Sequence, residues 1–259
     1  MAPKVISASR RTDLLACYPR YLKEKISEIH SAGELQALVI WTKNPANLLL
    51  DPGLNRLIVS LPLVYIHLTI TGLGGTRIEP GIPPAEETLR MLPELIKTVK
   101  SPDRVTWRFD PLLRLYDGEC GHSNIYLFRK LAREVSSAGI KTCRTSWLCV
   151  YGKVKNRVEK SGCSLYDSAP AERAREALLL EREAAKTGIT IQYCASPGFP
   201  RSSCIDGALL NTLHPSGASA KRARGQRALC GCTESLDIGS YSMKCGNACL
   251  YCYANPAAG

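Results

Sequence analysis

The stretch LQALVIWTKNP, residues 35–45, contains the pattern that decides the fold of this chain. An apolar run over residues 35–41, broken only by Gln36, is followed at once by the polar Thr42 and Lys43. A nearly continuous apolar run of this length is typical of a strand that is covered on both faces, as in a parallel sheet. The polar residues then stand where the strand ends.

The same pattern recurs along the chain, and helix signals lie between the apolar runs. The further runs are KVISAS (4–9), LVYIHLTI (63–70), DRVTWRF (103–109), IKTCRTSWLCV (140–150) and ITIQYC (189–194). Helical spacing with terminal Pro, Ser or Gly signals predicts helices over residues 18–33, 83–100, 123–139 and 169–188, with Pro93 kinking the second or beginning a new helix. Six strands alternating with helices predict a parallel α/β barrel, complete or partial, with a doubly wound open sheet as the alternative.

Polar side chains follow four of these predicted strands. They are Arg10, Arg11 and Asp13 after the first, Lys43 after the second, Thr69, Thr71 and Glu79 after the third, and Arg108 and Asp110 after the fourth. Any one of them could be a helix cap or part of a surface ion pair. An α/β barrel builds its active site at the carboxyl ends of its strands, so we expect these groups to share one cleft.

Composition restricts the class of protein. The 259 residues contain no apolar run long enough to cross a bilayer, and the N-terminus has no apolar signal region. These features predict a cytoplasmic protein that does not associate with a membrane. The net charge of +11 suits a polyanionic partner, and KRARGQR (221–227) is either a nucleic-acid contact or a solvated surface. In a reducing compartment, twelve cysteines favour metal binding over disulfides.

The cysteines gather at the end of the chain. Seven lie in the last 66 residues: Cys194, Cys204, Cys230, Cys232, Cys245, Cys249 and Cys252. The others, Cys17, Cys120, Cys143, Cys149 and Cys163, are scattered, and we expect them to be small buried hydrophobic residues. The sequence thus predicts a barrel over residues 1–194 and a cysteine-rich, cluster-binding tail over 195–259 that folds over the barrel mouth.

The spacing of the tail cysteines indicates what they hold. Thiolates select zinc or iron–sulfur clusters, and structural zinc prefers four ligands in paired short loops. Cys230-Gly231-Cys232 followed by Cys245-x3-Cys249-x2-Cys252 fits zinc poorly. Three thiolates on a [4Fe–4S] cluster leave one iron open to a small molecule, whereas four thiolates close the cluster.

Several motifs occur here in an order that resembles a known family. The Cys-x3-Cys-x2-Cys spacing, with Tyr251 before the last cysteine, is similar to the signature of radical S-adenosylmethionine (SAM) enzymes. Further motifs add to this resemblance: SRRTD, WTKNP, TITG followed by IEP, VTWRFDP, SCIDG and CGCTESLDIGSYSMKCGNACLYCYAN. Together, from residue 5 to 256, they resemble an uncharacterised bacterial and archaeal domain family similar to radical SAM proteins, with the cluster motif moved to the C-terminus.

The resemblance implies an iron–sulfur enzyme of radical SAM type. Cys245, Cys249 and Cys252 would bind a [4Fe–4S] cluster whose open iron takes SAM, with Tyr251, Thr69, Thr71 and Glu79 beside the cofactor. Gly74-Gly75 with Glu79 is a weak match to the stretch that receives the methionine amino group in such enzymes. Cys194, Cys204, Cys230 and Cys232 have the right number for a second [4Fe–4S] cluster, although buried thiols or mixed ligation are alternatives.

The strand-end residues would then act on SAM or on substrate. Arg10, Arg11, Lys43 and Arg108 could bind anionic groups, while Asp13 and Asp110 orient those arginines or bind ribose hydroxyls. The substrate is expected to be a small or anionic molecule, and the electron donor an external ferredoxin or flavodoxin. The alternatives are a non-catalytic two-cluster electron carrier and a zinc-stabilised nucleic-acid-binding protein.

Overall fold

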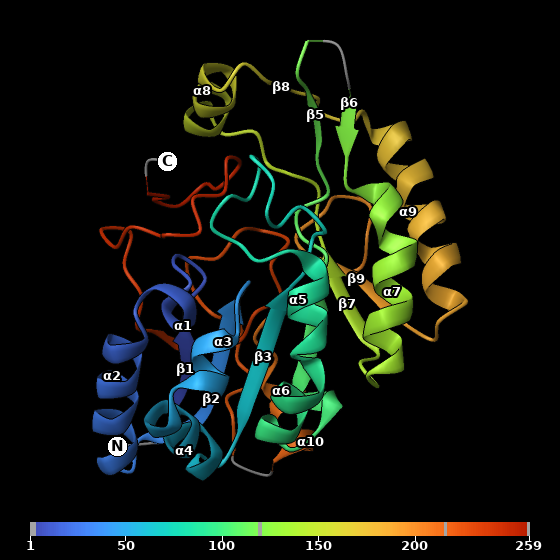
Figure 1. Ribbon diagram of the computed structural model, residues 1–259. Helices are drawn as coiled ribbons and strands as arrows, with labels where there is room; N and C mark the ends of the chain where they lie inside the picture. Colours follow the sequence, from blue (N-terminus) through green and yellow to red (C-terminus); the bar gives the residue numbers. More distant parts are fainter. Residues whose placement is uncertain (1–3, 119–120, 215–216, 258–259) are drawn as a thin grey trace.

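The computed structural model describes residues 4–118, 121–214 and 217–257, and a seven-stranded sheet forms its centre (Figure 1). Every pair of neighbouring strands in this sheet is parallel. In spatial order the strands are β10 (Leu236–Asp237), β1 (Lys4–Ala8), β2 (Leu35–Thr42), β3 (Val64–Thr69), β4 (Val105–Arg108), β7 (Thr142–Thr145) and β9 (Thr190–Tyr193). The parallel α/β arrangement predicted from the sequence is confirmed.

Alternate residues of the strands feed two separate apolar layers. Ile40 and Leu68 belong to the large core that includes the helices. Val39 and Tyr65 belong to a second core on the opposite face, together with four tail cysteines. Because side chains alternate across a strand, both faces of the sheet are covered, which explains the near-continuous apolar runs.

The helices that connect the strands cover one face of the sheet. They are α1 (Leu14–Cys17), α2 (Pro19–Ser31), α3 (Ala46–Leu50), α4 (Pro52–Ser60), α5 (Ala85–Arg90), α6 (Leu92–Val99), α7 (Phe128–Ser137) and α9 (Pro170–Ala185). Strand order advances from β1 to β9 without reversal, and the connecting helices all return along the same face. A doubly wound sheet needs such a reversal. No helix among the described residues is both long and apolar enough to span a membrane.

The sheet does not close into a complete barrel within the described residues. Its two edges are β9 and β10, and neither pairs with the other. The face that a closed barrel would enclose is instead covered by the chain after residue 194, including α10 (Gly207–Leu213). The complete barrel is therefore not observed, because the tail fills the space into which further strands would have to turn.

A small antiparallel sheet stands beyond the carboxyl ends of the main strands. It consists of β6 (Gly121–Ser123), β5 (Arg114–Tyr116) and β8 (Ser164–Leu165), and α8 (Gly152–Lys160) lies next to it. Val154 and Val158 of α8 pack into a third apolar cluster with Leu115 of β5 and with Cys249 and Tyr251 of the tail. This unit was not predicted from the sequence, because its strands have only two or three residues each.

Some predicted boundaries need correction. The run 140–150 forms a strand only over Thr142–Thr145, and the helix expected from Ser123 starts as the 3-10 turn η2 (Ile125–Leu127) before α7. Pro93 does begin a second helix, since it occupies the first turn of α6. A further 3-10 turn, η1 (Pro102–Arg104), precedes β4.

The scattered cysteines behave differently from one another. Cys143 and Cys163 are buried, as expected, but Cys149 is exposed on the loop after β7. Cys17 is half-buried at the end of α1 and does not pack as a simple core residue. Cys120 lies outside the described residues.

The tail returns along the first strand and helices. β10 pairs with β1, and the hydroxyl of Tyr18 then donates to the Lys244 carbonyl oxygen at 2.8 Å. Residues 244–256, which we call the motif loop, are closed by a hydrogen bond of 2.8 Å from the Cys245 amide to the Asn255 carbonyl oxygen. The division of the chain into a barrel (1–194) and a cluster-binding tail (195–259) stays a prediction. The tail does contribute one edge strand, β10, to the main sheet.

Removing residues 244–259 should leave the sheet and its connecting helices folded, because β10 lies before the cut. We expect the shortened chain to retain most of its far-UV circular dichroism at 222 nm, with a lower thermal midpoint. A chain ending at residue 234, which also lacks β10, should melt lower still. Loss of all helical signal in the first variant would show instead that the motif loop is part of the core.

Candidate functional site

The carboxyl ends of the parallel strands open into one cavity of about 680 Å3. Six of the residues predicted at strand ends line it: Arg10, Arg11, Lys43, Thr69, Arg108 and Asp110. Asp13, Thr71 and Glu79 lie behind this lining in buried hydrogen-bond networks. The structure thus brings most of the predicted strand-end groups together in one place, together with six of the seven tail cysteines.

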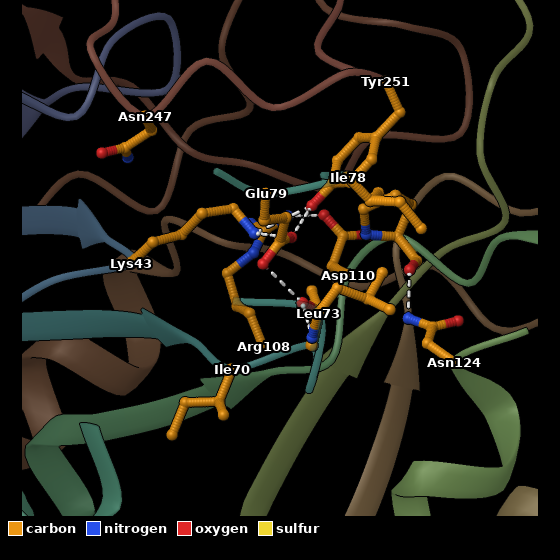
Figure 2. Close-up of polar contacts among 12 residues, drawn as sticks. Lys43, Ile70, Leu73, Ile78, Glu79, Arg108, Asp110, Asn124, Asn247 and Tyr251 are labelled. Carbon is orange, nitrogen blue, oxygen red and sulfur yellow. Dashed lines mark hydrogen bonds and ion pairs between the residues drawn. The ribbon is translucent and has the colours of Figure 1, made fainter. Parts of the chain in front are cut away.

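Half-buried Lys43 and the buried Glu79 and Tyr251 form a triangle at the floor of the site (Figure 2). The Lys43 ammonium donates to Glu79 Oε1 at 2.7 Å and to the Tyr251 hydroxyl oxygen at 2.9 Å, while that hydroxyl also donates to Glu79. The second carboxylate oxygen of Glu79 accepts from Thr71 Oγ1 at 2.8 Å. The triangle therefore ties the end of β2 and the loop after β3 to the motif loop.

The charges in this triangle stabilise one another. Burial lowers the pKa of Lys43, but the negative charges of the Glu79 carboxylate and of Cys249 as a thiolate outweigh it, so that the pKa lies above its ordinary value. Burial and the Glu79 charge both raise the pKa of Tyr251, which keeps its phenol protonated. Lys43 is thus a fixed cation, close to the middle cysteine of the motif.

Arg108 links the strand ends to the first cysteines of the tail. Its guanidinium forms an ion pair with Asp110, which also accepts from Ser146 Oγ (Figure 2 shows the Arg108 and Asp110 side chains). Its other terminal nitrogen donates to Cys204 Sγ at 3.4 Å. Burial lowers the pKa of Arg108, but the negative charges of Asp110 and Cys204 outweigh this effect. The net pKa lies above its ordinary value, so the guanidinium stays charged. Asp110 therefore orients Arg108 toward sulfur.

Cys194, Cys204, Cys230 and Cys232, which we call the cysteine quartet, lie side by side on the inner face of the sheet. The sulfur atoms of Cys194 and Cys204 are 3.9 Å apart. Hydrogen bonds from Cys194 and Cys232 hold the pKa of Cys204 well below its ordinary value, and contact with Cys232 lowers the pKa of Cys230 to about 6. The quartet is thus a continuous group of thiols, two of which readily become thiolates.

Donors converge on the sulfur atoms of the quartet. The backbone amides of Cys204 and Ile205 point at Cys232 Sγ, at 3.2 and 3.5 Å. A guanidinium nitrogen of Arg227 lies 4.0 Å from Cys194 Sγ. Amide and guanidinium donors around cysteine sulfur are what a negatively charged thiolate group, with or without bound metal, requires.

The motif loop holds the remaining three cysteines, here called the cysteine triad: Cys245, Cys249 and Cys252. Cys249 and Cys252 line the cavity. Arg157 of α8 fixes the loop from outside, because its guanidinium donates to the carbonyl oxygens of Leu250 at 3.1 Å and Cys252 at 2.7 Å. Burial raises the pKa of Cys249 to about 12, although the Lys43 charge opposes this shift.

Cys245 points toward a partner that the sequence did not reveal. Its sulfur lies 4.0 Å from the sulfur of Cys17, and contact with that thiol lowers the pKa of Cys245 to about 7. Cys17 is thus a fourth thiol beside the triad. The only sequence signal is that Cys17 follows Asp13 by one helical turn, which places both on the same side of α1.

Asp13 has a different role from the one predicted. Its Oδ2 accepts from the Thr42 hydroxyl at 3.1 Å, the Lys43 amide at 2.8 Å and the Asn247 side chain at 3.1 Å, while Oδ1 accepts from the Ala16 amide at 3.0 Å. Burial raises its pKa, and these hydrogen bonds oppose the rise. Among the described residues its partners are therefore amides and a hydroxyl, and it positions the motif loop rather than an arginine.

No group of three or more His, Cys, Asp or Glu side chains in the described part of the chain converges as a site for a single metal ion. The quartet is held together through neighbouring pairs of thiols instead. The sequence pattern groups the same four cysteines. It misses Arg157 and Ser146, which lie outside the family motifs, and Asn247, which lies inside the last motif but between the cysteines that define it.

The motif loop packs closely on the loop after β3. A Cβ atom at Gly81 would lie 2.4 Å from the Gly246 carbonyl oxygen and 2.9 Å from Asn247 Cα. We expect Gly81→Ala to push the loop away and to lower the free energy of unfolding by about 1–3 kcal/mol. Deuterium uptake over residues 244–256 should rise in hydrogen-exchange mass spectrometry.

Gly152→Ala is the matched control, because a Cβ atom at that position meets nothing within 4 Å. It should change neither stability nor exchange of the motif loop. Equal uptake in the Gly81→Ala variant and in the unaltered protein would contradict the close packing.

A family model described as a domain of unknown function (DUF1848) matches residues 5–254. Neither the curated proteins nor the solved structures contain a match to the chain. The matched region runs from β1 to Ala254 in the motif loop, so it includes the strand ends, the quartet and the triad. Because the match spans nearly the whole chain, this protein belongs to the DUF1848 family.

Proposed function

We propose that this protein is an iron–sulfur enzyme of radical SAM type that carries two [4Fe–4S] clusters. One observation supports this most strongly: members of both the triad and the quartet line the same cavity, which the strand-end cations also line. A cluster takes each thiolate on a different iron, so its ligands need not converge on one point as those of a single ion do. The donor set fits such a group.

In this proposal Cys245, Cys249 and Cys252 hold the cluster with the open iron, and the quartet holds a second, fully ligated cluster. The chemistry that the first cluster supplies when bound is one-electron reduction of SAM, which gives methionine and a 5′-deoxyadenosyl radical. Arg108 and Arg227 beside the quartet and Lys43 beside Cys249 would offset negative charge on the sulfur atoms. An external ferredoxin or flavodoxin would be the electron donor.

The protein's own side chains bind and orient the reactants. Six cations, Arg10, Arg11, Lys43, Arg108, Lys153 and Arg227, line the cavity against two carboxylates, Asp110 and Asp237. Asp110 is neutralised by Arg108, and Asp237 accepts from Ser7, Ser9 and the Gly239 amide. The cavity is therefore positive, and it suits the carboxylate of SAM and an anionic substrate.

Anaerobic reconstitution of the full chain tests the proposal. About eight irons and eight sulfides per chain are expected, from two four-iron clusters. Addition of SAM should alter the electron paramagnetic resonance (EPR) spectrum of the reduced protein, and dithionite with SAM should yield 5′-deoxyadenosine. Loaded clusters with no response to SAM would contradict the enzyme, and a colourless protein with stoichiometric zinc would contradict both clusters.

Single cysteine variants separate the two clusters. Cys249→Ala should lower the iron content to about four and abolish 5′-deoxyadenosine formation, whereas Cys194→Ala should lower iron similarly but keep the SAM-dependent EPR change. Cys143→Ala is the control, since this buried cysteine of β7 packs in the helix-side core. Full iron in Cys249→Ala would remove that residue from the ligand set.

Cys17 favours a second candidate function, a two-cluster electron carrier. If its thiol, 4.0 Å from Cys245 Sγ, completes the ligand set, the first cluster has no open iron. Cys17→Ser distinguishes the two functions. For the enzyme, the unaltered protein and the variant should respond to SAM alike. For the carrier, only the variant should show a SAM-dependent change in its EPR spectrum.

A further inference from the structure

Three tyrosines stand at the cavity with much of their surface in water. Tyr151, Tyr241 and Tyr253 all line it, and they are 45%, 56% and 43% exposed. The rings of Tyr151 and Tyr253 lie 6.2 Å apart between centroids, and the two residues come from α8's leading loop and from the motif loop. Exposed aromatic faces at the entrance of a functional cavity are available for a planar ligand.

Three arginines stand beside these rings without an acidic partner. Among the described residues, none of Arg10, Arg11 and Arg227 has a carboxylate oxygen within 4.0 Å. Arg10 donates to Gln226 Oε1 at 3.3 Å and Arg11 to the Gly239 carbonyl oxygen at 3.1 Å, which leaves other guanidinium donors open. The Arg11 guanidinium also lies 4.8 Å from the Tyr241 ring centroid.

We propose that this rim, formed by Tyr151, Tyr241, Tyr253, Arg10, Arg11 and Arg227, binds a nucleotide. Bases would stack on the tyrosine rings and phosphates would pair with the guanidinium groups. The inference rests on the proposed function in one respect, because it names the substrate class for the same cavity. A small carboxylate would need one cation and no ring, whereas an alternation of flat faces and separate cations matches base and phosphate.

The surroundings of the rim favour a nucleotide that is part of a single-stranded nucleic acid. Gly225, Gln226 and Arg227, the last part of the basic run 221–227, reach the cavity. Lys153 of α8, two residues after Tyr151, adds a further cation to the lining of the cavity. A base must be unpaired to present its face to tyrosine, so the ligand is either a free nucleotide or a single strand, and not a duplex.

Fluorescence anisotropy with the anaerobically reconstituted protein tests the inference. The probe is a fluorescein-labelled single-stranded RNA of about twelve nucleotides, a length within the usual range of site sizes. An abasic strand of equal length, the duplex form and adenosine monophosphate serve as competitors. We expect the RNA to bind and the abasic strand and the duplex to compete poorly. Competition by adenosine monophosphate would assign the site to a free nucleotide. If the monophosphate does not compete, the site belongs to a single-stranded nucleic acid.

Variants locate the binding on the rim. Tyr241→Leu should weaken RNA binding at least about fivefold, and Arg11→Gln should lower the slope of log Kd against log salt by about one. The controls are Tyr126→Leu, because Tyr126 is 78% exposed and does not line the cavity, and Arg133→Gln on the exposed face of α7. Both controls should bind RNA like the unaltered protein.

Equal binding of the abasic strand, or equal loss in the Tyr126→Leu control, would overturn the inference, since charge alone would then explain the affinity. So would no binding of either RNA or the monophosphate. Iron content and 5′-deoxyadenosine formation are measured on the same preparations. Intact SAM cleavage without nucleotide binding contradicts only this inference, whereas nucleotide binding without SAM cleavage contradicts only the proposed enzyme.

Discussion

The buried carboxylate of Asp13 is the contact on which the site depends. It accepts hydrogen bonds from α1, from the end of β2 and from Asn247 of the motif loop, which is 234 residues away in sequence. A buried donor left without its acceptor costs about 1–3 kcal/mol. Movement of the motif loop would therefore leave the Asn247 side-chain amide without this acceptor. Lys43 follows the same strand end, so the carboxylate that holds the loop also places the ammonium group beside Cys249.

On the inner face of the sheet, the cysteines of the candidate site are themselves part of the apolar core. Elsewhere the strands pack against Leu, Ile and Phe side chains of helices, but here Val39 and Tyr65 pack against the quartet. Thiols are small and weakly polar, so they can complete an apolar layer while the amides of Cys204 and Ile205 direct hydrogen bonds to sulfur. Ligand binding at such a position would add directly to the free energy of folding.

The strands and most helices could be predicted because their signals are local. The run 35–41 is apolar at nearly every position, since β2 is buried at every residue, and Pro93 and the glycines after helices mark element ends. Closure of the sheet could not be predicted, because it depends on whether the two edge strands pair with each other. Such a contact between distant segments leaves no local signal in the sequence. The grouping of the quartet followed from cysteine number, but the pairing of Cys17 with Cys245 joins two segments without any shared motif. The short helix α4 has a local signal as well, since Asp51 before Pro52 and Gly53 caps it, whereas α3 begins after Pro45 without a side-chain cap.

The position of the motif loop in the chain also has a consequence for the order of biosynthesis. The strands β1 to β9 and their helices lie within residues 4–193, and domains generally fold from the N-terminal side as the chain leaves the ribosome. The sheet can therefore form while the triad is still being translated. The last segment then docks on a surface that already exists, where Asp13, Gly81 and Arg157 await Asn247, Gly246 and the carbonyl of Cys252. The cysteine triad therefore reaches the site only after the strands β1 to β9 and their connecting helices have been translated.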